Sequence, residues 1–180
     1  MVKSTDKTKK ELEDYLNNKR IPLMLSLFYT KIPKNKLLEN LRKSTLKIND
    51  DTVDLSTLAK SLEQDNQYEL IIEHMINLAI KDAVSDYYEA ILKYCKNSNQ
   101  ESIFRKQQWY NYSRLIRNGL SHDYQWDFSK QDKNVFPVKY KQITINYDLH
   151  GTLLTKNQMS LSTIWTLLEE MENFVKTELN

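Results

Sequence analysis

The segment covering residues 67–96 constrains the fold more than any other part of the chain. Its apolar residues recur at every third or fourth position, a spacing that gathers them on one side of an α-helix. At about 1.5 Å per residue, such a helix spans on the order of 45 Å. The 180 residues include only two glycines and three prolines, so few positions interrupt long helices. We therefore expect a helical protein organised around this segment.

Helical spacing also predicts shorter helices before and after this segment. Pro22 is expected to interrupt or restart the first of them, because proline lacks the N–H that a helix interior uses. The strongly apolar residues 21–28 are expected to be buried. Asp54 or Ser56 is expected to cap a short helix, and Ser160 or Ser162 to start the last one. The predicted helices cover residues 7–20, 35–46, 56–62, 101–118 and 160–175.

One stretch near the C-terminal end has the alternation of a strand instead. Residues 137–147 alternate polar with β-branched or aromatic side chains, residues 148–151 have turn composition, and residues 152–155 can return as a second strand. This pattern predicts a small β-hairpin near residues 138–155. The expected fold class is all-α, a helical bundle with one appended hairpin, and residues 1–180 are expected to form a single domain.

Several kinds of protein are disfavoured by composition. No apolar run approaches the roughly 20 residues of a membrane span, and the first ten residues lack the apolar core of a signal peptide. The three histidines are scattered, and Cys95 has no partner at ligand spacing, so no metal site and no cofactor are expected. Phosphate-binding glycine motifs and a G-x-S-x-G nucleophile are absent. The cytoplasm is the expected location.

The residues that attract attention lie in the stretch 114–126, R-L-I-R-N-G-L-S-H-D-Y-Q-W. Gly119 is expected to end the preceding helix, which places Arg117 in its last turn and His122 just beyond it. Arginine keeps its charge, whereas an imidazole ordinarily titrates near neutrality. The stretch also lies in a positive part of the chain, with eight Lys or Arg against four Asp or Glu between residues 101 and 141. This combination favours a site that handles phosphate, although cations near a helix C-terminus also complement its dipole.

The sequence R-N-G-L-S-H, with its Arg117 and His122, resembles the R-x(4–6)-H motif of HEPN domains, including the polar Asn118 after the arginine. The resemblance implies a helical bundle that dimerises and cleaves RNA without a metal, in toxin–antitoxin or phage-defence systems. Tyr124 extends the match to R-x4-H-x-Y, as in HEPN toxins whose nucleotidyltransferase antitoxin adenylylates the tyrosine. The hairpin and the additional N-terminal helices depart from the smallest HEPN toxins.

The chemistry of RNA explains why these residue types suit such a motif. The 2′-hydroxyl is the nucleophile, a histidine can move protons at neutral pH, and a guanidinium can hold the charge of the transition state. A 2′,3′-cyclic phosphate is the expected product. One His per chain makes a homodimer with two facing motifs attractive. The expected catalytic residues are Arg117, His122 and Asn118, and the expected RNA-binding residues are Tyr124, Trp126, Arg114 and Arg105.

Two other functions remain open at this level. The chain is alternatively a non-catalytic HEPN-like module that binds RNA or another protein, in which His122 is dispensable. The second of these functions is that of a helical scaffold, in which the short motif occurs by chance. Trp126 has a structural alternative as well, because tryptophan is more often a core residue than a base-stacking one.

Overall fold

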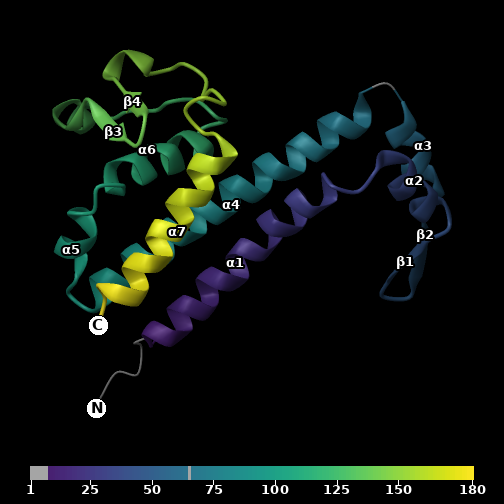
Figure 1. The fold of residues 1–180 in the computed structure, drawn as a ribbon, viewed down its shortest axis with the longest axis horizontal. Coiled ribbons are helices and arrows are strands. Elements are labelled where there is room, and N and C mark those ends of the chain that lie inside the picture. The colour runs from purple at the N-terminus through teal and green to yellow at the C-terminus, as the bar shows by residue number, and fades with distance from the viewer. Residues whose placement is uncertain (1–7, 65) are drawn as a thin grey trace. The chain divides into compact units, whose positions relative to one another are not determined.

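The structure is a computed structural model that describes residues 8–64 and 66–180, and it is mostly helical (Figure 1). Two small antiparallel hairpins accompany the helices, so the predicted all-α fold with an appended hairpin is confirmed. The chain divides into two compact units. The first contains the chain up to Arg20 together with Ile80–Asn180, and the second contains Ile21–Ala79. The helices α1 (Lys9–Tyr29) and α4 (Gln67–Asn97) each contribute to both units.

The first unit holds the candidate motif. Besides the first half of α1 and the second half of α4, it contains α5 (Glu101–Arg105), α6 (Tyr110–Ser121) and α7 (Leu161–Thr177). The hairpin β3 (Val138–Tyr140) and β4 (Ile143–Ile145) follows the short 3-10 helix η1 (Lys130–Val135), and η2 (Tyr147–Leu149) follows the hairpin. Its core is rich in aromatic side chains that are at most 6% exposed: Tyr87, Tyr88, Phe104, Trp109, Tyr110, Tyr112, Trp126 and Phe174.

A buried polar cluster joins three helices of this unit. The Arg20 guanidinium on α1 donates to both carboxylate oxygens of Glu172 on α7, at 3.2 and 3.3 Å. The Tyr87 hydroxyl on α4 donates to the same carboxylate at 2.6 Å. The ring of Trp165 covers Arg20 at 3.7 Å. Because Glu172 is only 8% exposed, these donors stabilise a carboxylate that burial alone would destabilise.

The second unit contains α2 (Lys34–Arg42), the hairpin β1 (Thr45–Ile48) and β2 (Asp51–Asp54), and α3 (Ser56–Glu63). The second half of α1 and the first half of α4 complete it. Its small core consists of Leu38, Ala59 and Leu62 with Leu41 packed against them. The N-cap residue of α3 is Leu55 and no side chain caps the helix, so the predicted cap at Asp54 or Ser56 is wrong. The Asp54 carboxylate instead accepts from the N–H of the first helical residue, Ser56, at 2.9 Å. The β1–β2 hairpin was not predicted.

Several predicted element boundaries are confirmed. The central helix runs from Gln67 to Asn97, against the predicted 67–96. Ser160 caps α7, and its hydroxyl accepts from the Thr163 N–H at 3.2 Å. The start predicted at Lys7 for the first helix lies outside the described residues.

Other predicted boundaries are wrong. Pro22 lies inside α1, which continues to Tyr29. The helix predicted over residues 101–118 is two helices, because the chain turns between Arg105 and Tyr110. This turn lets Phe104 pack edge-on against both Trp109 and Tyr110, with ring centroids 5.6 and 5.1 Å apart. Aromatic packing therefore outweighs the continuous helical pattern.

The hairpin near the C-terminal end is shorter than predicted. Both of its strands lie within residues 138–145, and Val138 pairs with Ile145 while Tyr140 pairs with Ile143. Lys141 takes the positive φ of 51° that the tight connection needs. The stretch 152–155, predicted as the return strand, instead reaches the motif segment through an isolated bridge between Leu153 and Gln125.

The predicted burial of residues 21–28 is also wrong for most of this stretch. Leu23 is 0% exposed, but Phe28 is 61% and Leu25 is 52% exposed. The apolar character of this stretch is therefore not explained by the core of its own unit.

Candidate functional site

Helix α6 fixes the backbone of the candidate motif. Its buried side carries Tyr112, Leu115, Ile116 and Leu120, each 0% exposed. Arg117 is on the same helix with its side chain 34% exposed. The helix continues two residues past Gly119 and ends at Ser121, so the predicted helix end at Gly119 is wrong. His122 is the C-cap residue, and its N–H donates to the Asn118 carbonyl at 3.1 Å.

Gly119 has a packing role in place of the predicted helix-ending role. A Cβ atom added there would lie 2.6 Å from Leu154 Cδ1 and 3.1 Å from the Gln125 carbonyl oxygen. Both distances are shorter than ordinary van der Waals contacts. The glycine therefore allows the segments around Gln125 and Leu154 to approach α6 directly beside the motif.

The Arg117 guanidinium is held by its neighbours. Its Nη1 donates to the Asn118 side-chain oxygen at 2.9 Å, and its Nη2 forms an ion pair with Glu89 of α4. The guanidinium carbon also lies 5.8 Å from the centre of the Tyr88 ring. Glu89 is 51% exposed, so this ion pair is in contact with solvent. Exposed ion pairs typically contribute about 0–1 kcal/mol, which leaves the guanidinium able to exchange partners.

The His122 imidazole has a different carboxylate neighbour. Its Nε2 atom lies 3.4 Å from an oxygen of Asp127, and the two side chains are 58% and 51% exposed. Among the described residues, no hydrogen bond joins His122 to Arg117. The motif therefore presents two separate polar groups, each beside its own carboxylate.

The turn that follows His122 has an unusual backbone. Asp123 and Tyr124 have φ angles of 52° and 61°, in the left-handed region that residues other than glycine rarely adopt. The Leu154 N–H donates to the Tyr124 carbonyl at 2.8 Å, and the Gln125 N–H donates to the His122 carbonyl at 3.0 Å. Two consecutive residues of this kind cost on the order of 1–3 kcal/mol each, so the surrounding contacts must hold the turn in place.

Tyr124, predicted to bind RNA or to be modified, is half-buried in this turn. Burial raises the pKa of its phenol, and the nearby charge of Asp82 raises the pKa further. The hydroxyl is therefore protonated at neutral pH.

The other predicted RNA-binding residues are not all available at the surface. Trp126 is 1% exposed, and its indole N–H donates to the Gln158 side chain at 3.1 Å. Its ring therefore lies in the core, where a base cannot stack on it. The alternative prediction, that Trp126 is a core residue, is confirmed.

Two arginines that were predicted to contact RNA have carboxylate partners. Arg114 forms a 2.6 Å ion pair with Asp132, which is 5% exposed, so this arginine is committed to the structure. Burial works to raise the pKa of Asp132, but hydrogen bonds from Ser129 and Arg114 outweigh it and the pKa is lowered. Arg105 is 55% exposed and donates to Glu101 at 2.6 Å and to the Tyr110 hydroxyl at 2.9 Å.

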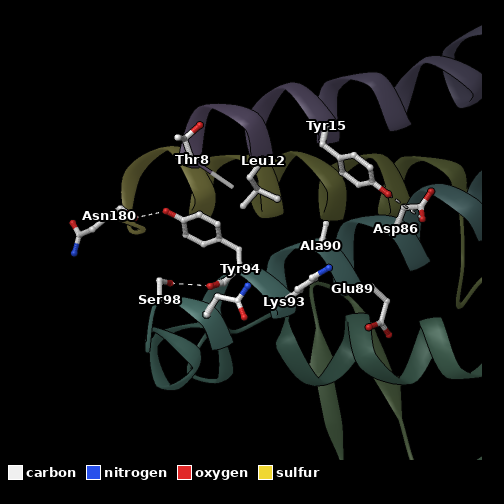
Figure 2. Close-up of a pocket in the computed structure, with 11 residues that line it drawn as sticks. Thr8, Leu12, Tyr15, Asp86, Glu89, Ala90, Lys93, Tyr94, Ser98 and Asn180 are labelled. Carbon is white, nitrogen blue, oxygen red and sulfur yellow. Dashed lines mark hydrogen bonds between the residues drawn. The ribbon is translucent and has the colours of Figure 1, made fainter. Parts of the chain in front are cut away.

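A hollow of about 800 Å³ has Glu89 among its lining residues (Figure 2). Tyr15 comes from α1 and Tyr94 from α4, and each phenol is held at its hydroxyl. Lys93 and Glu89 bring opposite charges to the lining. Because Glu89 both lines the hollow and pairs with Arg117, the hollow adjoins the motif. The remaining lining residues are Thr8, Leu12, Asp86, Ala90, Asn97, Ser98 and Asn180.

The two carboxylates beside the motif were not predicted as site residues. Asp127 lies five positions after His122, so its place in the sequence was a usable signal. Glu89 lies 28 positions before Arg117, and only the packing of α6 on α4 brings the two together. No local pattern pointed to Glu89.

The described residues include no group suited to a metal ion, no reactive cysteine and no membrane-spanning helix. No group of three or more His, Cys, Asp or Glu among residues 8–64 and 66–180 is arranged to hold a metal ion. Cys95 is 0% exposed, and burial raises the pKa of its thiol to about 12. No helix within the described part of the chain has the length and apolarity needed to cross a membrane.

Comparison with known proteins adds nothing to this geometry. No protein-family model, curated protein or solved structure matches the chain.

Proposed function

We propose that this chain is an endoribonuclease of HEPN type that needs no metal, and that Arg117 and His122 act on the RNA backbone. The observation that carries the proposal is their placement near one end of α6, where both side chains reach solvent from a helix whose opposite side is buried. Each faces a carboxylate in an exposed pair. A phosphodiester can replace such a partner at a cost of about 1 kcal/mol or less.

The reaction follows from the chemistry of the two side chains. The His122 imidazole accepts the proton of the 2′-hydroxyl, the 2′-oxygen attacks phosphorus, and the bond from phosphorus to the 5′-oxygen breaks. The leaving 5′-oxygen takes up a proton, and the products are a 2′,3′-cyclic phosphate and a 5′-hydroxyl. Arg117 binds the charged phosphate oxygens, which gain charge in the transition state. Asn118 accepts from Arg117, so its proposed role is to position the guanidinium.

The leaving 5′-oxygen needs a proton from a second group, because the His122 imidazole takes up the proton of the 2′-hydroxyl in the same step. The His122 of a second copy supplies it in the proposed homodimer. We further propose that the enzyme acts in the cytoplasm, in a toxin–antitoxin or phage-defence system. In that setting, a nucleotidyltransferase antitoxin modifies Tyr124 and so adds an anion to the segment that carries the motif.

The hollow beside Glu89 supports an extended substrate. Its volume of about 800 Å³ lies within the range of sites that take small molecules and cofactors, so it can hold a nucleotide next to the scissile phosphate. Lys93 offers a cation for the neighbouring phosphate. The carboxylates of Asp86 and Glu89 oppose a polyanion, and their pairing with Lys19 and Arg117 reduces this repulsion.

The test is cleavage of an end-labelled single-stranded RNA in the presence of EDTA. We expect His122→Ala to lower the rate by ~10²–10⁴ and Arg117→Ala by ~10²–10³, without loss of folding. The double variant should fall well short of the product of the two losses, because both groups serve one transition state. A 2′-deoxyribose at the scissile position should block cleavage.

Two matched controls come from the second unit. His74 is an exposed histidine, and Arg42 is an exposed arginine paired with Glu63, so His74→Ala and Arg42→Ala should cleave as the wild type does. Cleavage of the deoxy substrate, or a need for Mg²⁺, would show a different mechanism. A protein that binds RNA without cleaving it would favour the non-catalytic binding module. The ion pair of Arg117 with Glu89 also favours that module.

A further inference from the structure

The second half of α1 has an apolar side that its own unit leaves uncovered. Residues 21–30 contain no charged side chain. Leu23 and Ser26 are buried, but positions 21, 24, 25 and 28 fall on the opposite side of the helix and are exposed. We call these four residues the α1 stripe: Ile21 at 47%, Met24 at 51%, Leu25 at 52% and Phe28 at 61% exposure.

The first half of α4, in the same unit, carries a second exposed apolar set. We call it the α4 stripe: Leu70 at 56%, Ile71 at 38%, Met75 at 38% and Leu78 at 43% exposure. Ile71, Met75 and Leu78 have the spacing of one helix side, and their span of seven positions equals that from Ile21 to Phe28. The two stripes therefore match in length.

The charges around the stripes are complementary. Between residues 67 and 80, α4 carries Glu69 and Glu73 and no Lys or Arg. The α1 stripe contains no acidic residue and is followed by Lys31 and by Lys34, whose Nζ atom already lies 4.0 Å from the Glu69 carboxylate of the same chain. Packing one α1 stripe on another would bring like charges together, whereas packing an α1 stripe on an α4 stripe brings opposite charges together.

The exposed area is that of a specific interface. Eight large apolar side chains about half exposed leave roughly 100 Å² each, or on the order of 800 Å² per chain. The largest apolar patch on a typical monomer is about 300–600 Å², and a standard interface buries about 800 Å² per partner. The two stripes together thus have the size that a stable dimer needs.

We propose that the second unit carries a self-association surface, in which the α1 stripe of one copy packs against the α4 stripe of a second copy. A twofold axis makes this contact occur twice, so both stripes of both copies are covered. The surface lies in the unit that lacks Arg117 and His122, so it stands independently of the proposed ribonuclease activity.

The first experiment measures the dissociation constant by sedimentation over a concentration series. We expect the wild type to dimerise, and Leu25→Glu and Met75→Glu each to weaken dimerisation. A buried charge at such a contact costs about 30-fold, and each change occurs twice in the dimer, so the loss is on the order of 10³-fold. The matched control is Leu58→Glu, because Leu58 is 45% exposed on α3 of the same unit and belongs to neither stripe. Circular dichroism checks that each variant folds.

The second experiment identifies which helices meet. Met24→Cys protein is mixed with Met75→Cys protein under mild oxidation, and the native Cys95 is too deeply buried to react. We expect the mixed disulfide to form faster than either self-disulfide. A wild type that is monomeric at about 100 µM would overturn the proposal. Self-association that neither glutamate variant weakens would do so as well, as would self-disulfides in excess of the mixed one.

Discussion

Glu89 competes with RNA phosphate for Arg117 if the proposed function is right, and Glu89→Gln tests this directly. The carboxylate pairs with the Arg117 Nη2 atom, and both side chains reach solvent at 51% and 34% exposure. RNA must displace this partner before its phosphate can reach the guanidinium. Glutamine keeps an oxygen that can accept from Arg117, so the arginine stays oriented, but the charge that competes with phosphate is lost.

The size of the effect follows from the exposure of the pair. Exposed ion pairs contribute about 0.2–1 kcal/mol, so removing this one should tighten RNA binding by between 1.4-fold and about fivefold. Removing a negative charge that faces the RNA acts in the same direction, and the gain should shrink as salt is added. Arg117→Ala should weaken binding and abolish the gain, because no guanidinium remains to be released.

The assay is fluorescence anisotropy with a 2′-deoxy-substituted oligonucleotide, which binds without being cleaved. Glu63→Gln is the matched control, because Glu63 pairs with Arg42 at a similar exposure of 41% and 47% in the other unit. The control should bind as the wild type does. If Glu89→Gln binds no tighter than Glu63→Gln, the competition argument is wrong. If it binds tighter but cleaves more slowly, Glu89 positions Arg117 for catalysis.

Three further predictions concern the motif and its support. Gly119→Ala should lower the free energy of unfolding by about 1–3 kcal/mol in a urea titration, because the new methyl meets Leu154, whereas Ser121→Ala should be nearly neutral. Asp132→Asn should cost about 1–3 kcal/mol at pH 7. The folded pKa of Asp132 is lowered, so its contribution is present above the unfolded value of 3.8 and is lost as pH falls through the folded value; unfolding curves of variant and wild type should therefore converge in acid. Tyr124→Glu should suppress cleavage while Tyr124→Phe largely preserves it, and equal cleavage by both would contradict the proposed regulation.

The sequence predicted the elements whose side-chain pattern is satisfied within one helix. The 67–96 periodicity matched α4 to within one residue, because a long stripe averages over local exceptions. The capping of α7 by Ser160 was predictable for a similar reason, since the hydroxyl bonds to a residue three positions away.

The wrong predictions involve contacts between distant segments. Gly119 looked like a helix end, but its role depends on Leu154, which the local pattern does not reveal. The break after Arg105 depends on where Trp109 and Tyr110 find aromatic partners. In the same way, the sequence singled out Arg117 and His122 as site residues but not Glu89, which reaches the site only through the packing of α6 on α4.

The three arginines of the predicted site, one catalytic and two RNA-binding, show why geometry has to be combined with burial. All three have a carboxylate partner, so pairing alone does not separate them. Arg114 is bound to a buried Asp132, and freeing it would leave an unpaired charge in the core at a cost of several kcal/mol.

Arg105 is exposed, but its partner Glu101 lies one turn away on the same short helix. Arg117 differs from both, because its partner Glu89 is exposed and comes from another helix that also lines the adjoining hollow. A phosphate that displaces Glu89 therefore gains the guanidinium without exposing a buried charge, and the displaced carboxylate remains in water. A count of basic residues between 101 and 141 does not show this difference. If the proposed function is right, it makes Arg117 the arginine best suited to bind the scissile phosphate.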